Sequence, residues 1–123
     1  MASPDLKPLR ILIVEDDALI NMLLADMLEM MGHVVCATEF TKAGAVAAAA
    51  RCLPDMMIVD AQLGSDSGIA AVEEILTSRF VPHVFVSGNI RGVLALKPHA
   101  AVAEKPYTEA SLAAAMNTAR LLT

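Results

Sequence analysis

The chain of 123 residues has the length of one domain, and 56% of its residues are hydrophobic, which is ample for a buried core. Its formal net charge of −5, without a basic run, argues against a nucleic acid or an acidic membrane as the main partner. No apolar run approaches the roughly 18 residues of a membrane span, and the start of the chain does not resemble a secretory signal. We therefore expect a cytoplasmic protein with a flexible lead-in at residues 1–8 and free thiols at Cys36 and Cys52.

Apolar runs of strand length alternate along the chain with segments whose apolar residues recur at helical spacing. Strands are predicted at residues 10–16, 33–38, 55–60, 83–88 and 99–105, of which the first and third read as buried and the fifth as weaker. Helices are predicted at residues 17–32, 41–53, 69–80 and 108–122, and a loop is predicted at residues 64–68. Thr108 is the expected N-cap of the last helix. Gly92 and Pro98 leave room for only a turn or two of helix between the fourth and fifth strands.

The first predicted helix carries apolar residues on one face, and we expect that face to pack on the sheet. Asn21, Ala25, Asp26 and Glu29 are expected on its wetter side. Asp17 should cap the helix through a side-chain oxygen. Four methionines of this helix are interpreted as packing residues, with a docking face for a partner helix as the alternative: Met22, Met27, Met30 and Met31.

Strands that alternate with helices predict a parallel sheet covered on both faces, with right-handed crossovers. In such sheets ligands bind outside the carboxyl ends of the strands, where the strand order reverses. The sequence places chemically active residues at these ends: Glu15, Asp16 and Asp17 after the first strand, Asp60 after the third, Ser87 after the fourth and Lys105 after the fifth.

The acids at these strand ends indicate a cation site. Two like charges about 4 Å apart repel by roughly 1 kcal/mol even in water, and more near a protein surface. A hard divalent cation such as Mg²⁺ takes carboxylate oxygens and offsets that repulsion, so Glu15, Asp16 and Asp60 are candidate metal-binding residues. The loop after the first strand contains no glycine, so it lacks the backbone cradle of a nucleotide-binding loop.

The same constellation suits phosphoryl transfer, which needs in-line positioning and charge neutralisation rather than covalent chemistry from many groups. The carboxylate of Asp60 can act as a nucleophile toward phosphorus. Lys105 would neutralise a phosphoryl oxygen as a point charge, and the Ser87 hydroxyl could donate a hydrogen bond to another. For Ser87, which precedes Gly88, plain turn chemistry is the alternative.

The segments ILIVEDD, IVDAQLGSDSG, VFVSGN and EKPY, in this order, resemble a response-regulator receiver domain of two-component signalling. The resemblance covers residues 9–123 as one domain. It implies an α/β, doubly wound, flavodoxin-like fold with a five-stranded parallel sheet of order 2-1-3-4-5. A cis Lys105–Pro106 bond is frequent in this family. PHVFVSGN partly resembles a subgroup with a PFxFATGY-like fourth strand.

The resemblance also implies a role for each site residue. Asp60 would be the phosphoacceptor, Ser87 the switch hydroxyl and Lys105 the lysine of the family's site. Asp16 would contact Mg²⁺ directly, with Glu15 as the second acid of the pocket. The backbone carbonyl of Gln62 would be the third protein ligand of the metal, and Mn²⁺ could replace Mg²⁺.

A receiver domain would take its phosphoryl group from a phosphohistidine on a sensor histidine kinase or a histidine phosphotransfer protein. It would be a switch that assists its own phosphotransfer and dephosphorylation, and not an enzyme with a separate substrate. Because the chain ends soon after the last predicted helix, we expect a stand-alone regulator whose output is protein–protein interaction or phosphate shuttling. No nucleic acid or membrane partner is expected.

The sequence departs from the family pattern at three places, and the first two motivate an alternative, a receiver-like docking module that works without phosphorylation. Val102 stands where the family usually has an aromatic switch residue, three positions before the lysine. The segment from Ser87 to Lys105 is short, which predicts a shortened or irregular fourth helix. Gly64 stands where many members have proline. The three histidines match no ligand spacing and are expected at the edge or surface: His33, His83 and His99.

Overall fold

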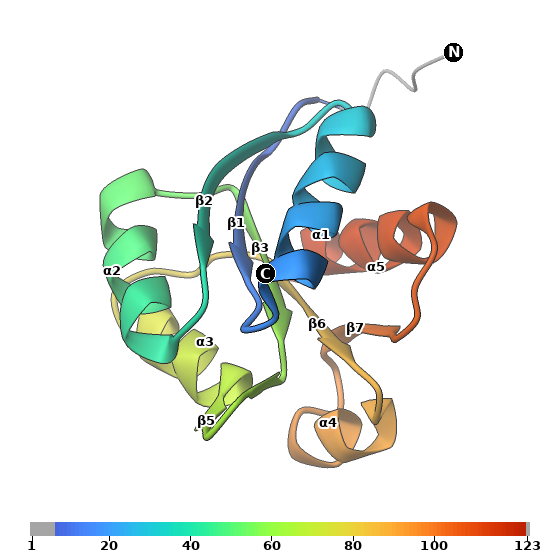
Figure 1. The fold of residues 1–123 in the computed structure, drawn as a ribbon. Coiled ribbons are helices and arrows are strands. Elements are labelled where there is room, and N and C mark those ends of the chain that lie inside the picture. Colours follow the sequence, from blue (N-terminus) through green and yellow to red (C-terminus); the bar gives the residue numbers. More distant parts are fainter. Residues whose placement is uncertain (1–6, 123) are drawn as a thin grey trace.

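A single five-stranded parallel sheet forms the centre of the protein in a computed structural model that describes residues 7–122 (Figure 1). The strands are β1 (Arg10–Val14), β2 (Val34–Glu39), β3 (Met56–Asp60), β6 (His83–Ser87) and β7 (Ala101–Glu104), in the spatial order β2-β1-β3-β6-β7. This confirms the predicted order 2-1-3-4-5. Most of the expected lead-in, residues 1–6, lies outside the described range, as does Thr123.

Within residues 7–122, five helices surround the sheet: α1 (Ala18–Met30), α2 (Lys42–Cys52), α3 (Gly68–Leu76), α4 (Ile90–Leu96) and α5 (Glu109–Leu121). Figure 1 shows α1 and α5 on one face of the sheet and α2 and α3 on the other. Helix α4 lies near the carboxyl end of β6 and has only seven residues, which confirms the predicted shortening. Among the helices that the structure describes, none combines the length and the hydropathy that a membrane crossing requires.

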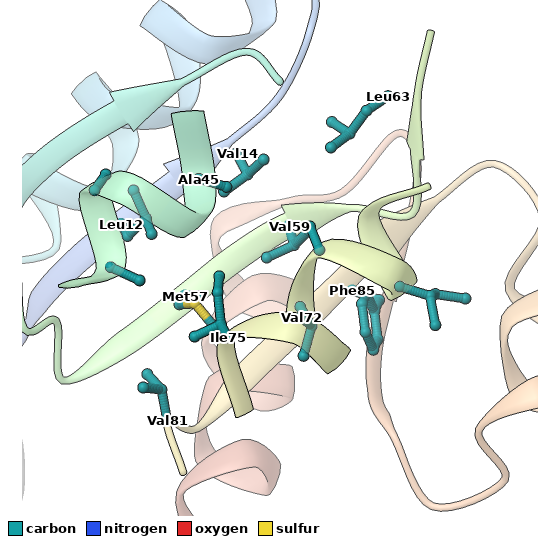
Figure 2. Packing of buried hydrophobic residues seen from close by; sticks show 14 of the residues in the cluster. Leu12, Val14, Ala45, Met57, Val59, Leu63, Val72, Ile75, Val81 and Phe85 are labelled. Atoms are coloured by element: carbon teal, nitrogen blue, oxygen red, sulfur yellow. The ribbon is translucent and has the colours of Figure 1, made fainter. Parts of the chain in front are cut away.

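Strand residues alternate between two apolar layers, one on each face of the sheet. In β1, Ile11 and Ile13 face the layer of α1 and α5, whereas Leu12 and Val14 face the layer of α2 and α3. Figure 2 shows the second layer, where strand side chains such as that of Phe85 pack against the helices. The buried residues of α2 are alanines (Ala45, Ala48 and Ala49), and their small side chains allow this helix to lie close to the sheet.

The structure corrects the prediction of a loop at residues 64–68. A small antiparallel hairpin forms there, with β4 (Gln62–Leu63) paired to β5 (Asp66–Ser67). Gly64 has a φ of 58°, which proline cannot adopt because its ring fixes φ near −65°. The tight turn therefore excludes proline at this position and favours glycine. Helix α3 follows at once, starting at Gly68 and ending at Leu76 rather than at the predicted residue 80.

Helix α1 packs on the sheet with most of the predicted face but differs from the prediction at single positions. Asn21, expected on the wetter side, is only 2% exposed and shares the buried face with Leu24 and Leu28. Met22 and Met30, expected to pack, are 56% and 83% exposed. Other parts of the predicted face are confirmed: Leu24 and Leu28 are buried, and Met27 and Met31 are half-buried against the layer of α1 and α5.

Other local predictions are confirmed. The side chain of Asp17 accepts hydrogen bonds from the first turn of α1, and Thr108 caps α5 in a capping box with Ser111. Both cysteines are free thiols, and the Lys105–Pro106 bond is cis. The expectation that all three histidines lie at the edge or surface is wrong for His33, which is buried and accepts the backbone N–H of Leu9 at Nδ1.

Candidate functional site

Three carboxylates meet at the carboxyl edge of the sheet. Strands β1 and β3 pair in register with Val14 opposite Val59, so the next residues, Glu15 and Asp60, lie side by side. Together with Asp16, they offer carboxylate oxygens that all lie within 4.8 Å of one another. Glu15 is 1% exposed and Asp60 6% exposed, whereas Asp16 is open to solvent. The structure therefore brings the three predicted acids into one partly buried cluster.

Lys105 provides the positive charge of this cluster. Its backbone N–H donates to the carbonyl oxygen of Ser87 at 2.9 Å, which continues the pairing of β7 with β6. Its ammonium nitrogen Nζ lies 2.7 Å from Asp60 Oδ2 and 2.9 Å from Glu15 Oε1. One lysine thus contacts both buried acids, at the edge of the sheet where its place after the fifth strand predicted it.

Burial and charge act in opposite directions on the protonation of the site. Burial raises the pKa of Glu15 and outweighs the opposing effect of its hydrogen bonds from Lys105 and the Asp17 N–H. Burial alone would lower the pKa of Lys105, but its hydrogen bonds to Asp60 and Glu15 raise that pKa above the ordinary value. Three carboxylates around one ammonium leave the pocket with a net negative charge, which a hard divalent cation would neutralise.

Asp60 is held by its own backbone surroundings. Its Oδ1 accepts the backbone N–H of Gln62 at 2.9 Å, which fixes the carboxylate plane. Gly68, the first residue of α3, packs directly on the main chain of Asp60, and its N–H donates to the Ala61 carbonyl oxygen at 2.9 Å. A Cβ at Gly68 would overlap the Asp60 carbonyl oxygen, so this close approach requires glycine.

Ser87 and Gln62 lie at the same edge as the acids. Asp60 pairs with Val86, so Ser87 is the next residue along the neighbouring strand. The Ser87 hydroxyl oxygen accepts the backbone N–H of Asn89 at 2.9 Å, which is the turn role weighed as the alternative. Gln62 contributes its N–H to Asp60, and a metal-ligand role for its carbonyl stays a prediction.

Val102 and Asn21 are two further residues whose surroundings the structure defines. Val102 is half-buried and packs against the layer of α2 and α3, opposite Phe85 in the neighbouring strand. Asn21 was missed as a contact of the site: its side-chain nitrogen donates to the carbonyl oxygen of Glu15. The spacing of Asn21 with Leu24 and Leu28 was the available signal, because residues three and seven apart share one face of a helix.

Comparison with known proteins places this geometry in a family. Residues 11–117 match the response regulator receiver domain. The chain belongs to that family. It is therefore a signalling domain of the two-component type, and its acidic pocket is a receiver-domain pocket in which a metal could be held.

Solved receiver domains share the fold over nearly the whole chain. The receiver domain of PhyR from Erythrobacter litoralis is 30% identical, with a TM-score of 0.84 over 94% of this chain and 92% of that one. SdrG from Sphingomonas melonis Fr1 is 34% identical, with a TM-score of 0.78 over 92% of this chain and 97% of that one.

A curated relative is the transcriptional regulatory protein PdtaR of Mycobacterium tuberculosis. It is 38% identical over 80 residues, which are 65% of this chain and 39% of PdtaR. The match thus spans about two fifths of the length of this relative.

Proposed function

We propose that this receiver domain accepts a phosphoryl group on Asp60 from a phosphohistidine of a sensor histidine kinase or a histidine phosphotransfer protein, in a Mg²⁺-dependent reaction. The observation that carries the proposal is the ammonium of Lys105, held between Asp60 and Glu15 at the carboxyl edge of the sheet. A nucleophilic carboxylate, a cation beside it and an acidic pocket for a metal are the parts that phosphoryl transfer to an aspartate requires.

In the proposed reaction a carboxylate oxygen of Asp60 attacks the phosphorus atom. The phosphorus–nitrogen bond to the donor histidine breaks, and its electron pair returns to the imidazole as the acyl phosphate forms. The Gln62 N–H fixes the plane of the Asp60 carboxylate before attack. Lys105 is close enough to Asp60 to transfer one of its hydrogen bonds to a phosphoryl oxygen, while Glu15 keeps it in place.

The acid cluster fits Mg²⁺ because all of its donors are hard carboxylate oxygens. Both oxygens of Glu15 already accept protein hydrogen bonds, from Lys105 and from the Asp17 N–H. The solvent-open carboxylate of Asp16 is therefore the better direct ligand, together with Asp60 and the Gln62 carbonyl. Mg²⁺, which Mn²⁺ could replace, would supply positive charge to the acids and to the phosphoryl oxygens.

Exposed apolar residues of α1 offer a place for the phosphodonor protein. Leu19, Met22 and Leu23 are 59%, 56% and 55% exposed on the helix that follows the acidic loop. A neighbouring cavity of about 420 Å³ is lined by Leu23 and Tyr107 and reaches Lys105. A protein that brings its histidine to Asp60 would cover this surface, because Lys105 both lines the cavity and contacts Asp60. For the exposed Met22, this proposal corresponds to the docking face that the sequence analysis gave as the alternative to packing.

The output is proposed to be protein–protein interaction or phosphate shuttling in the cytoplasm, with no turnover of a separate substrate. PhyR of Bartonella quintana has been solved in complex with the anti-sigma factor NepR, and it is 34% identical over 63% of this chain, with a TM-score of 0.61. A protein partner is therefore the expected target here. The net charge of −5 supports a protein rather than a nucleic acid as that target.

A second candidate function is the docking module that works without phosphorylation. Three observations favour it: Val102 in place of an aromatic switch residue, the seven-residue α4, and the Ser87 hydroxyl already bound to the Asn89 N–H. In that case Asp60→Asn would leave partner binding and signalling intact. Under the leading proposal the same substitution abolishes signalling.

The phosphoacceptor proposal is tested by intact-protein mass after incubation with phosphoramidate, with Mg²⁺ and with a chelator. We expect one added phosphoryl group that requires Mg²⁺ and is absent in Asp60→Asn. Asp66→Asn is the matched control, because Asp66 is an exposed acid in the adjacent hairpin and should leave the adduct unchanged. A folded wild-type protein that neither gains the group nor binds Mg²⁺ would favour the docking module.

A further inference from the structure

Asn21 is a polar residue at a buried position of α1, where apolar residues usually pack. It lies in the second turn of α1, is only 2% exposed, and shares its face of the helix with the buried Leu24 and Leu28. A buried amide costs free energy unless its hydrogen-bonding groups are paired. Its contacts should therefore show what this asparagine contributes.

The side-chain nitrogen of Asn21 connects three segments of the chain. Nδ2 lies 3.1 Å from the carbonyl oxygen of Glu15 and 3.3 Å from the carbonyl oxygen of Glu39. The same Glu39 oxygen accepts the backbone N–H of Glu15 at 3.0 Å. Asn21 thus closes a ring that ties the end of β1, the end of β2 and the start of α1 together.

This ring controls the peptide group that leads into Asp16. The Glu15 N–H and carbonyl oxygen are both fixed, and the Glu15 carboxylate is held by Lys105 and the Asp17 N–H. Because the peptide group is planar, fixing the Glu15 carbonyl also fixes the direction in which the chain enters Asp16. The backbone sets the position of the Asp16 Cβ, and with it the reach of the exposed Asp16 carboxylate, of which an oxygen lies within 4.8 Å of oxygens of Glu15 and Asp60.

We propose that Asn21 is a positioning residue of the Mg²⁺ site: by holding the Glu15–Asp16 peptide, it keeps the Asp16 carboxylate within reach of Asp60. The inference rests on the proposed function above, because it concerns the same acids. Residues that orient metal ligands typically contribute about 10- to 100-fold to metal affinity. Asn21 acts through Asp16 and need not touch the reacting atoms.

The test measures Mg²⁺ binding alone, by calorimetry on metal-free protein, for wild type, Asn21→Leu and Asn21→Ala. Leucine fills a similar volume and suits the apolar face beside Leu24, and alanine guards against a steric misfit. We expect both variants to bind Mg²⁺ at least about tenfold more weakly and to gain less thermal stability from Mg²⁺. Asn117→Leu, at an exposed position of α5, is the matched control and should bind as wild type.

A second readout separates positioning from general support of the fold. With phosphoramidate as donor, the Mg²⁺ concentration for half-maximal phosphorylation should rise in both Asn21 variants, while the rate at saturating Mg²⁺ stays close to wild type. Unchanged Mg²⁺ affinity in both variants beside a binding wild type would overturn this inference alone. Unfolding of both variants would also overturn it. Failure of wild type to bind Mg²⁺ would overturn the proposed function as well.

Discussion

The ammonium of Lys105 allows the electrostatics of the pocket to be tested by one substitution, Lys105→Met. Its ion pairs of 2.7 and 2.9 Å join side chains of Asp60 and Glu15 that are only 9% and 2% exposed. Removing one partner of a buried ion pair typically costs about 3–5 kcal/mol. Because the Lys105 side chain is 26% exposed and partly screened, we expect the lower end, about 3 kcal/mol. For a chain of this size, that loss lowers the unfolding midpoint by about 10 °C.

The assay is calorimetric unfolding at neutral pH in the presence of a chelator, with Lys97→Met as the matched control. Lys97 forms an equally short ion pair, 2.8 Å to Glu73, but the two side chains are 40% and 57% exposed. Exposed pairs contribute about 0–1 kcal/mol, so the control should barely change the midpoint. A Lys105→Met effect no larger than that of Lys97→Met would refute the reasoning from burial.

The effect of Lys105→Met should also depend on pH in a defined direction. The folded protein raises the pKa of Lys105 above its ordinary 10.5. Its contribution to stability is therefore fully present below pH 10.5 and is lost as the pH rises through the raised pKa. The difference between wild type and Lys105→Met should persist at neutral pH and shrink in strong alkali.

Three further changes test separate parts of the account. Gly68→Ala should slow phosphorylation by about a hundredfold in the mass assay, because the added Cβ would displace the main chain of Asp60. Gly88→Ala is the control and should match wild type, because a Cβ at Gly88 meets open space. Thr108→Ala removes a capping box and should cost about 1 kcal/mol in denaturant unfolding; an unchanged midpoint would contradict the cap. Burial lowers the pKa of His33, which must stay neutral to accept the Leu9 N–H, so stability should fall as pH drops below 6.5. His33→Gln should flatten that slope in thermal melts across this pH range, and an unaltered slope would assign it to other groups.

Much of the fold and the site could be predicted because both depend on patterns that sequence carries directly. The switch between strand-length apolar runs and helical spacing locates the sheet and its helices. Since parallel strands end at one edge, the acids after β1 and β3 and the lysine after β7 had to converge. The pocket of Glu15, Asp60 and Lys105 follows from topology more than from any single motif.

The errors arose where the signal was local or ambiguous. In α1 the apolar residues outnumber the buried positions, so the sequence pattern did not decide which of them are buried. The burial of Asn21 is explained only by its hydrogen bonds to two carbonyl oxygens, which the pattern does not show. The hairpin at residues 62–67 has two-residue strands, which are too short to show alternation. His33 was expected at the edge or surface as the first residue of a strand, whereas its ring accepts the N–H of Leu9, a contact distant in sequence that the local pattern does not show.

The most direct test of the central claim is to locate the phosphoryl group by peptide mass spectrometry after incubation with a phosphodonor and Mg²⁺. The account predicts a single acyl phosphate on Asp60, in the peptide that contains β3, and none when Mg²⁺ is removed by a chelator. A phosphoryl group on another residue, with Asp60 unmodified, would contradict the account. Stable partner binding that is identical in wild type and Asp60→Asn would then identify the chain as a constitutive docking module.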